Sequence, residues 1–306
     1  MEKIDRLGWA AGISFVSYGL RIGIRVNNRD VMARLPDILP PHTKPARSPK
    51  VARLYSLVVG GAGPRSSVRR FNVLYADAAR VARTVELETA VDALESDLQL
   101  YVADRAHRRL FVHAGVVGWR GRAIIIPGRS FTGKSTLVAA LVRAGATYYS
   151  DEYAVFDAQG RVHPYPKPLS IRGETGAGFR RFRPVELSGL PGDNPLPAGL
   201  VVVTSYRAGA QWRPRRLSPG RAVLALLANT VSARRHPQLA LTTLPRIVSQ
   251  ALLLNSVRGE AEELVDSLLN KAERAPIVLT KNGRARVAAY GGERVAAVAG
   301  AATDRR

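Results

Sequence analysis

The chain is 306 residues long, with 46% hydrophobic and 23% charged residues, a composition typical of one or two folded domains that excludes wholesale disorder. It contains no cysteine, which excludes disulfides, thiolate metal centres and cysteine nucleophiles. Its formal net charge is +22, but no five basic residues are consecutive, so we expect an arginine-rich surface rather than a nucleic-acid-binding segment.

The first part of the chain is predicted to combine strands with a helix. Apolar and polar residues alternate from Tyr18 to Val26, which is typical of a half-buried strand. The other elements predicted here are a short helix and two strands, over residues 28–35, 51–60 and 71–75. The glycine-rich residues 60–63 between these two strands predict a flexible turn.

A long amphipathic helix is predicted over residues 85–105. Its apolar residues recur at three- and four-residue steps and therefore share one face: Leu87, Val91, Leu94, Leu98 and Val102. We place a domain boundary directly after this helix, so that residues 1–108 form a smaller α+β domain. Residues 109–275 then form a second domain, and residues 276–306 a partly disordered tail rich in glycine, alanine and arginine.

The second domain is predicted to be α/β. It opens with a β-hairpin over residues 110–117 and 122–127, in which glycines supply the turn. The later elements are a helix, a β-prone segment, a buried strand and three helices, over residues 134–144, 147–150, 200–204, 218–233, 245–257 and 260–272. Strands that alternate with helices in this way are typical of an α/β fold.

Residues 128–135 match the phosphate-loop pattern G-x-x-x-x-G-K-[ST] without a departure. Glycines at both ends let backbone N–H groups face phosphate oxygens, the lysine supplies positive charge, and the final serine ligates Mg²⁺. An apolar strand precedes the loop and a helix follows it, as such a site requires. The predicted nucleotide-binding residues are Gly128, Arg129, Ser130, Phe131, Thr132, Gly133, Lys134, Ser135 and Thr136.

Two adjacent carboxylates follow the β-prone segment 147–150. Asp151 and Glu152 come after a strand–loop–helix–strand sequence, which would return them to the edge where Lys134 lies. There one carboxylate can accept a proton from an attacking hydroxyl while the other ligates Mg²⁺. The alternative is that the pair occupies a solvated turn and takes no part in chemistry. The buried strand 200–204 ends without a carboxylate, so it supplies no rival candidate.

The segment from His113 to Glu152 resembles the catalytic domain of HPr kinase/phosphorylase, a bacterial serine kinase whose phosphate loop is related to that of phosphoenolpyruvate carboxykinase. Gly128 follows His113 by fifteen residues, and the acidic pair follows Lys134 by seventeen and eighteen, as in that family. The Ser-Pro-Gly-Arg sequence at residues 218–221 is similar to the start of a family helix. The resemblance covers about residues 110–233.

The resemblance implies a P-loop kinase domain with a mixed sheet and flanking helices, and ATP and Mg²⁺ as cofactors. The enzyme would transfer the γ-phosphoryl group to a hydroxyl, on a serine of a protein or peptide or on a small molecule. Its implied catalytic residues are Lys134, Asp151 as the proton acceptor, and His113 near the γ-phosphate. Ser135 and Glu152 would lie at the metal.

The chain departs from the family pattern at two positions. The second acid of the pair is usually aspartate, whereas here it is Glu152. Ser170 occupies the place of a family glutamate that contacts Mg²⁺, and Glu174 is the residue that could substitute for it. His113 also fits a buried strand histidine, and Arg221 fits either a phosphate ligand or a solvated helix start.

Several alternatives to a kinase stay open at this point. A nucleotide-gated binding module without phosphotransfer, a carboxykinase-like enzyme and a nucleic-acid-dependent ATPase all use a phosphate loop. We expect no nucleic-acid partner, and the family implies a possible homo-oligomer. No apolar stretch reaches the roughly 18 residues that a spanning helix needs, so we expect a cytoplasmic protein without membrane insertion.

Overall fold

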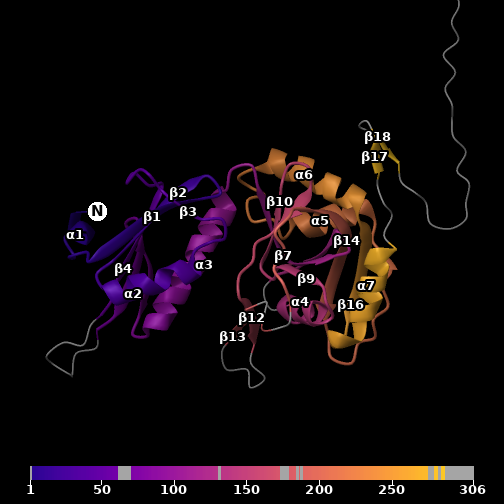
Figure 1. The fold of residues 1–306 in the computed structure, drawn as a ribbon, viewed down its shortest axis with the longest axis horizontal. Helices are drawn as coiled ribbons and strands as arrows, with labels where there is room; N and C mark the ends of the chain where they lie inside the picture. Colours follow the sequence, from indigo (N-terminus) through magenta and orange to yellow (C-terminus); the bar gives the residue numbers. More distant parts are fainter. Residues whose placement is uncertain are drawn as a thin grey trace, which may run out of the picture.

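The computed structural model describes residues 2–60, 70–129, 132–172, 179–183, 186, 189–274, 279–281 and 284–286. Over these residues the chain is a mixed α/β protein with two large mixed sheets (Figure 1). The first sheet precedes helix α3 (Leu87–Arg105) in the sequence and the second follows it. Helix α3 lies on the side of the N-terminal half that faces the C-terminal half (Figure 1).

The N-terminal sheet has six strands in the order β3-β1-β2-β4-β5-β6. The strands are β1 (Ala11–Ser17), β2 (Leu20–Val26), β3 (Lys44–Pro45), β4 (Arg53–Val58), β5 (Asn72–Ala76) and β6 (Ala79–Thr84). The predicted alternation is confirmed in β2, where Ile22, Ile24 and Val26 are buried. This strand begins after Tyr18 and Gly19, because both have positive φ and form the tight turn from β1.

Helices cover one face of this sheet. They are α2 (Arg29–Arg34), the 3-10 helix η1 (Leu35–Ile38) and α3, which share one core with Ile22 and Ile24. The short helix α1 (Glu2–Asp5) contacts Arg25 of β2, whose side chain alternates with this core face. Helix α2 begins after Asn28, whose side chain accepts hydrogen bonds from the N–H groups of Asp30 and Val31. The predicted apolar face of α3 is confirmed, since Val91, Leu94 and Leu98 are buried.

The C-terminal sheet has eight strands: β11-β10-β7-β8-β14-β16-β15 form one path, and β9 also pairs with β7. The strands are β7 (Leu110–Trp119), β8 (Arg122–Pro127), β9 (Thr147–Ser150), β10 (Tyr153–Phe156), β11 (Arg161–His163), β14 (Leu196–Tyr206), β15 (Arg215–Arg216) and β16 (Leu252–Arg258). Strands β8, β14 and β16 are parallel neighbours, and β7 is antiparallel to β8. The predicted hairpin at the start of this half is therefore confirmed.

Helices cover both faces of the C-terminal sheet. They are α4 (Lys134–Arg143), α5 (Pro219–Leu227), α6 (Pro237–Gln250), η3 (Glu262–Leu264) and α7 (Val265–Glu273). Helices α4 and α7 share one core with Ile124 and Ile126 of β8. Helices α5 and α6 share another core with Ile125, on the opposite face of the same strand. The alternation of β8 thus builds a three-layer α/β/α arrangement.

The structure corrects the helix predicted over residues 245–257. Helix α6 begins at Pro237 and continues through Pro245, and residues 252–258 form strand β16. Pro245 leaves the carbonyl of Leu241 without its helical partner, which is tolerable because Leu241 is exposed to water. The apolar run that follows is compatible with either a buried helix or a strand, and parallel pairing with β14 decides in favour of the strand.

One other predicted boundary also differs. Helix α5 ends at Leu227 rather than near residue 233, because Asn229 accepts a hydrogen bond from the N–H of His113. Two small hairpins complete the described elements, β12 (Leu169–Arg172) with β13 (Phe179–Phe182) and β17 (Leu279–Lys281) with β18 (Arg284–Arg286). The predicted disordered tail lies mostly outside the described residues.

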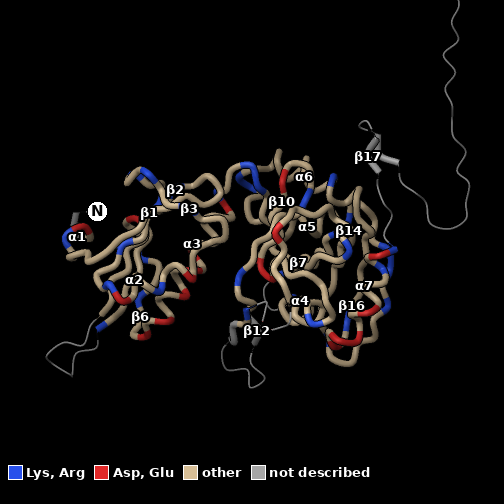
Figure 2. Tube along the Cα trace, viewed as in Figure 1, with Lys and Arg blue, Asp and Glu red and all other residues tan. Residues whose placement is uncertain are grey.

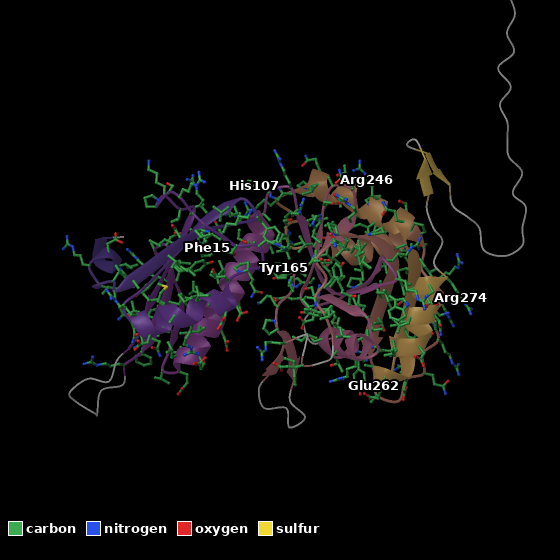
Figure 3. All side chains as sticks on the ribbon, in the orientation of Figure 1. Phe15, His107, Tyr165, Arg246, Glu262 and Arg274 are labelled. Atoms are coloured by element: carbon green, nitrogen blue, oxygen red, sulfur yellow. The ribbon has the colours of Figure 1, made fainter. Side chains whose placement is uncertain are left out.

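The two halves share a hydrophobic core. The cluster beneath the N-terminal sheet also contains Phe111, Tyr153 and Tyr165 from the C-terminal half. Their rings lie edge-to-face, with centroids 5.6–5.9 Å apart. Tyr165 is labelled where the halves meet in Figure 3.

Two expectations from the composition can be compared with the structure, one on membrane-spanning helices and one on the distribution of basic residues. Among the described helices, none combines the length and apolar character that crossing a membrane would require. Lysine and arginine are spread over both halves of the chain in the view of Figure 2.

Gly115 of β7 tests the packing of helix α4 on the sheet. A Cβ at this position would lie 2.6 Å from Cγ2 of Val138, so Gly115→Ala should lower the free energy of unfolding by about 1–3 kcal/mol. Urea denaturation measures the effect. Gly220→Ala is the matched control, because its Cβ would meet no atom within 4 Å and should cost nothing. Equal unfolding midpoints for the two variants would contradict this packing.

Candidate functional site

Strand β7 brings the phosphate loop and the acidic pair together. On one side it pairs with β8, which leads into the loop, and the N–H of Gly128 donates to the carbonyl of His113. On the other side it pairs with β9 and then β10, and the turn between these two strands carries the acidic pair. The N–H of Ala114 donates to the carbonyl of Glu152, so the acidic turn lies across one strand from the loop.

The described part of the phosphate loop has the backbone that its sequence predicts. Gly133 precedes helix α4 with φ +80°, a left-handed conformation that favours glycine. Nζ of Lys134 donates to the carbonyl of Arg129 at 2.6 Å, within the loop. Burial lowers the pKa of Lys134, and the charges of Asp151 and Glu152 oppose that shift. Thr136 is exposed on the helix, and the predicted ligands Ser130 and Phe131 lie outside the described residues.

Asp151 contacts the last residue of the loop motif. Oγ of Ser135 donates to Oδ2 of Asp151 at 2.7 Å, and the hydroxyl of Tyr148 lies 3.0 Å from Oδ1. Asp151 is only 8% exposed, although it follows a strand end. A solvated position for Asp151, which the alternative reading of the sequence requires, does not fit a buried carboxylate that is hydrogen-bonded to a hydroxyl of the phosphate loop.

Glu152 has different surroundings from its neighbour. Its Oε2 lies 3.8 Å from Nζ of Lys167, and its side chain is 41% exposed. The pKa of Glu152 is raised, and burial of the carboxyl group among protein atoms is the largest cause. The charges of Asp151 and Glu95 also raise this pKa, whereas Lys167 and, more weakly, Lys134 lower it. The two carboxylates therefore point to different partners, Asp151 to the loop and Glu152 to Lys167.

His113 lies beside Lys134 and the backbone of Glu152. Burial lowers its pKa, the positive charge of Lys134 lowers it further, and a hydrogen bond with the backbone of Glu152 opposes both effects. Its ring is 4.7 Å from that of Tyr153. A histidine that titrates below its ordinary range is neutral at physiological pH and can accept or donate a hydrogen bond near phosphate.

The structure adds residues that the sequence analysis missed. Arg258, at the end of β16, is buried and donates from Nη2 to the carbonyl of Gly133 at 2.8 Å, which supports the loop from outside. Lys167 and Glu95 form an ion pair beside the acidic turn. A signal for Glu95 was present, because it is a carboxylate between Val91 and Leu98 on the apolar face of its helix. Arg258 had no such signal in a chain with so many arginines.

The other residues that the sequence analysis named are Arg221, Ser170 and Glu174. Arg221 is exposed in the first turn of α5, and no contact within the described residues joins it to the phosphate loop. Ser170 lies in β12, and Glu174 lies outside the described residues.

The donor set at Ser135 and Asp151 fits Mg²⁺. A hydroxyl and a carboxylate oxygen are hard ligands of the kind that Mg²⁺ prefers, and this ion usually takes only one or two protein groups beside substrate phosphates. Within the described ranges, this site included, no three histidine, cysteine or acidic side chains are grouped so as to hold a metal. The residues therefore fit an ion that nucleotide phosphates also hold.

No protein-family model matches the chain, and no curated protein matches it.

The contact between the loop and Arg258 can be tested at Gly133. An added Cβ there would collide with Nη2 of Arg258 and would also keep the strained φ of +80°. Gly145 has φ +94° and open space, so Gly145→Ala incurs only the backbone cost of about 1–2 kcal/mol. We expect Gly133→Ala to lower the unfolding free energy more than Gly145→Ala. In an Arg258→Ala background, Gly133→Ala and Gly145→Ala should lower the unfolding free energy by similar amounts. If Gly133→Ala still lowered it more, the contact would be contradicted.

Proposed function

We propose that the chain is an ATP-dependent kinase of the HPr-kinase-like P-loop type. It would transfer the γ-phosphoryl group of ATP to a hydroxyl, on a serine of a protein or peptide. The observation that carries the proposal is the 2.7 Å hydrogen bond between Ser135 and Asp151, which joins the phosphate loop to a buried carboxylate. Phosphoryl transfer needs such an arrangement to hold the metal against the phosphates.

The topology supports the same assignment. A phosphate loop follows the first of three parallel strands, β8, β14 and β16, at their carboxyl edge. Ligands of open α/β sheets bind at this edge. On this basis we propose the fold of the HPr kinase and carboxykinase P-loop domains for residues 109–275.

Each residue near the loop has a part in the proposed reaction. Mg²⁺, when bound, would neutralise the charge on the β- and γ-phosphates. Ser135 and Asp151 would hold that ion, and Lys134 would exchange its bond with the carbonyl of Arg129 for one with phosphate oxygens. His113 would donate or accept a hydrogen bond beside the γ-phosphate.

The geometry favours Glu152 over Asp151 as the proton acceptor, the reverse of the division that the family resemblance implies. Both oxygens of Asp151 already face donors, whereas Glu152 is partly exposed beside it. The acceptor hydroxyl oxygen would form a bond to the γ-phosphorus while the bond from phosphorus to the β–γ bridging oxygen breaks. The hydroxyl proton would pass to the carboxylate of Glu152, and ADP would leave.

The two carboxylates give distinct predictions. Glu152→Gln should lower kcat about 100- to 10,000-fold and leave Mg·ATP binding intact, because it removes only the proton acceptor. Asp151→Asn should raise the Mg²⁺ concentration needed for half-maximal turnover, because it weakens the metal site. Transfer of label from [γ-³²P]ATP into a size-fractionated lysate, with free phosphate counted in parallel, measures both.

Asp193→Asn, the same chemical change at an exposed position, is the control and should behave as the wild type. Unimpaired transfer by Glu152→Gln would remove it as the proton acceptor. Free phosphate without any labelled acceptor would instead identify an ATPase. Tight ATP binding with neither product would identify the nucleotide-gated binding module.

A further inference from the structure

A short proline-rich segment, residues 164–168, is held by both halves of the protein. We call it the proline segment; it belongs to neither a helix nor a strand. The carbonyl of Pro164 lies 3.2 Å from Nε2 of His42 in the N-terminal half. Tyr165 is fully buried at the junction, with its ring 6.3 Å from that of Tyr18 (Figure 3).

Lys167 connects helix α3 to the acidic turn. Its Nζ pairs with Oε1 of Glu95 at 2.5 Å and lies 3.8 Å from Oε2 of Glu152. Gln99, one turn further along α3, donates to the same Oε1 at 3.0 Å and so fixes the Glu95 carboxylate. The side chains of Lys167 and Glu95 are only 11% and 9% exposed.

The main chain of Lys167 reaches the other carboxylate. Its carbonyl lies 2.8 Å from the hydroxyl of Tyr148, which is also 3.0 Å from Oδ1 of Asp151. A tyrosine hydroxyl has one proton, so it donates to one of these oxygens at a time. One residue of the proline segment therefore contacts Glu152 directly and Asp151 through Tyr148.

A buried ion pair contributes little net stability compared with apolar side chains of the same size, because both charges lose their hydration. On the buried face of α3, Glu95 and Gln99 are the polar side chains among apolar ones, and a leucine in place of Glu95 would not carry that cost. The position of the pair beside Glu152 indicates what it does instead. A carboxylate that reacts must be held in one orientation, and an ammonium fixed from the other side can hold it.

We infer that Lys167 and Glu95 are positioning residues of the phosphotransfer site, so that helix α3 of the N-terminal half completes the site. Glu95 fixes Lys167, and Lys167 orients Glu152 toward the acceptor hydroxyl. Displacement of α3 would withdraw Glu95 and leave the acidic turn without this support. The inference rests on the proposed kinase function, and its test separates the two.

The test compares stability with turnover in the full chain. Glu95→Gln and Lys167→Met each leave one buried charge without its partner and should lower both the unfolding temperature and kcat. The double variant Glu95→Gln/Lys167→Met has neither charge and should recover the unfolding temperature of the wild type. Its kcat should stay about 10- to 100-fold low, because the orientation of Glu152 is still lost. KM for ATP should not change, because the phosphate loop is intact.

A second ion pair on the same helix is the control. Arg34 pairs with Glu88 at 2.6 Å on the exposed side of α3, so Arg34→Met/Glu88→Gln should leave kcat unchanged. Wild-type kcat in the double variant would overturn the inference, since the pair would then be only structural. If variants of Lys167 fail to fold, Glu95→Gln alone decides, because it is isosteric and wild-type kcat in it has the same meaning.

The wild type separates this inference from the proposed function. A wild type that neither transfers phosphate nor releases it would end the kinase proposal whatever the variants do. An active wild type together with a fully active double variant would end only the role of Lys167 and Glu95.

Discussion

The contact between Ser135 and Asp151 depends on which strands pair with the two edges of strand β7. One edge of this strand pairs with β8 and so determines where the phosphate loop begins. The other edge pairs with β9 near one end and with β10 near the other, and the chain turns between them at the acidic pair. Because neighbouring strands are about 4.8 Å apart, a loop and a turn on opposite sides of one strand are within side-chain reach.

Close packing beneath the loop keeps the distance between Ser135 and Asp151 short. Gly115 of β7 leaves room for Val138 of α4, so the helix that carries Ser135 lies directly on the sheet. Arg258 at the end of β16, the parallel strand beyond β14, supports the loop by its hydrogen bond to the carbonyl of Gly133. The loop is thus held by its own helix and by two strands, which would pre-organise the phosphate site of the proposed kinase at little further cost in entropy.

The N-terminal half is joined to this site by a shared apolar core and by a buried ion pair. Phe111, Tyr153 and Tyr165 pack into the core of the N-terminal sheet, so the two halves are not joined only by a linker. Since packed cores are rigid, a change in the position of α3 would reach the acidic turn through Lys167. The inferred role of this connection would explain a buried carboxylate at Glu95, which the apolar pattern of Val91, Leu94 and Leu98 does not.

The sequence by itself determined the features that depend on a few consecutive residues. The phosphate loop, the hairpin before it, the alternation of β2 and the apolar face of α3 all follow from local backbone preferences and from periodicity. The spacing of Asp151 from Lys134 also predicted their proximity, because a strand, a helix and a strand of ordinary length return the chain to the same edge.

Only the tertiary structure decided the features that depend on distant partners. An apolar run at residues 252–254 becomes a strand because β14 pairs with it, and nothing within the run distinguishes a strand from a helix. Lys167, Glu95 and Arg258 are common residue types, and their importance arises from contacts with residues 15 to 125 positions away. Such contacts are made when separate elements pack together, so no local pattern in the sequence records them.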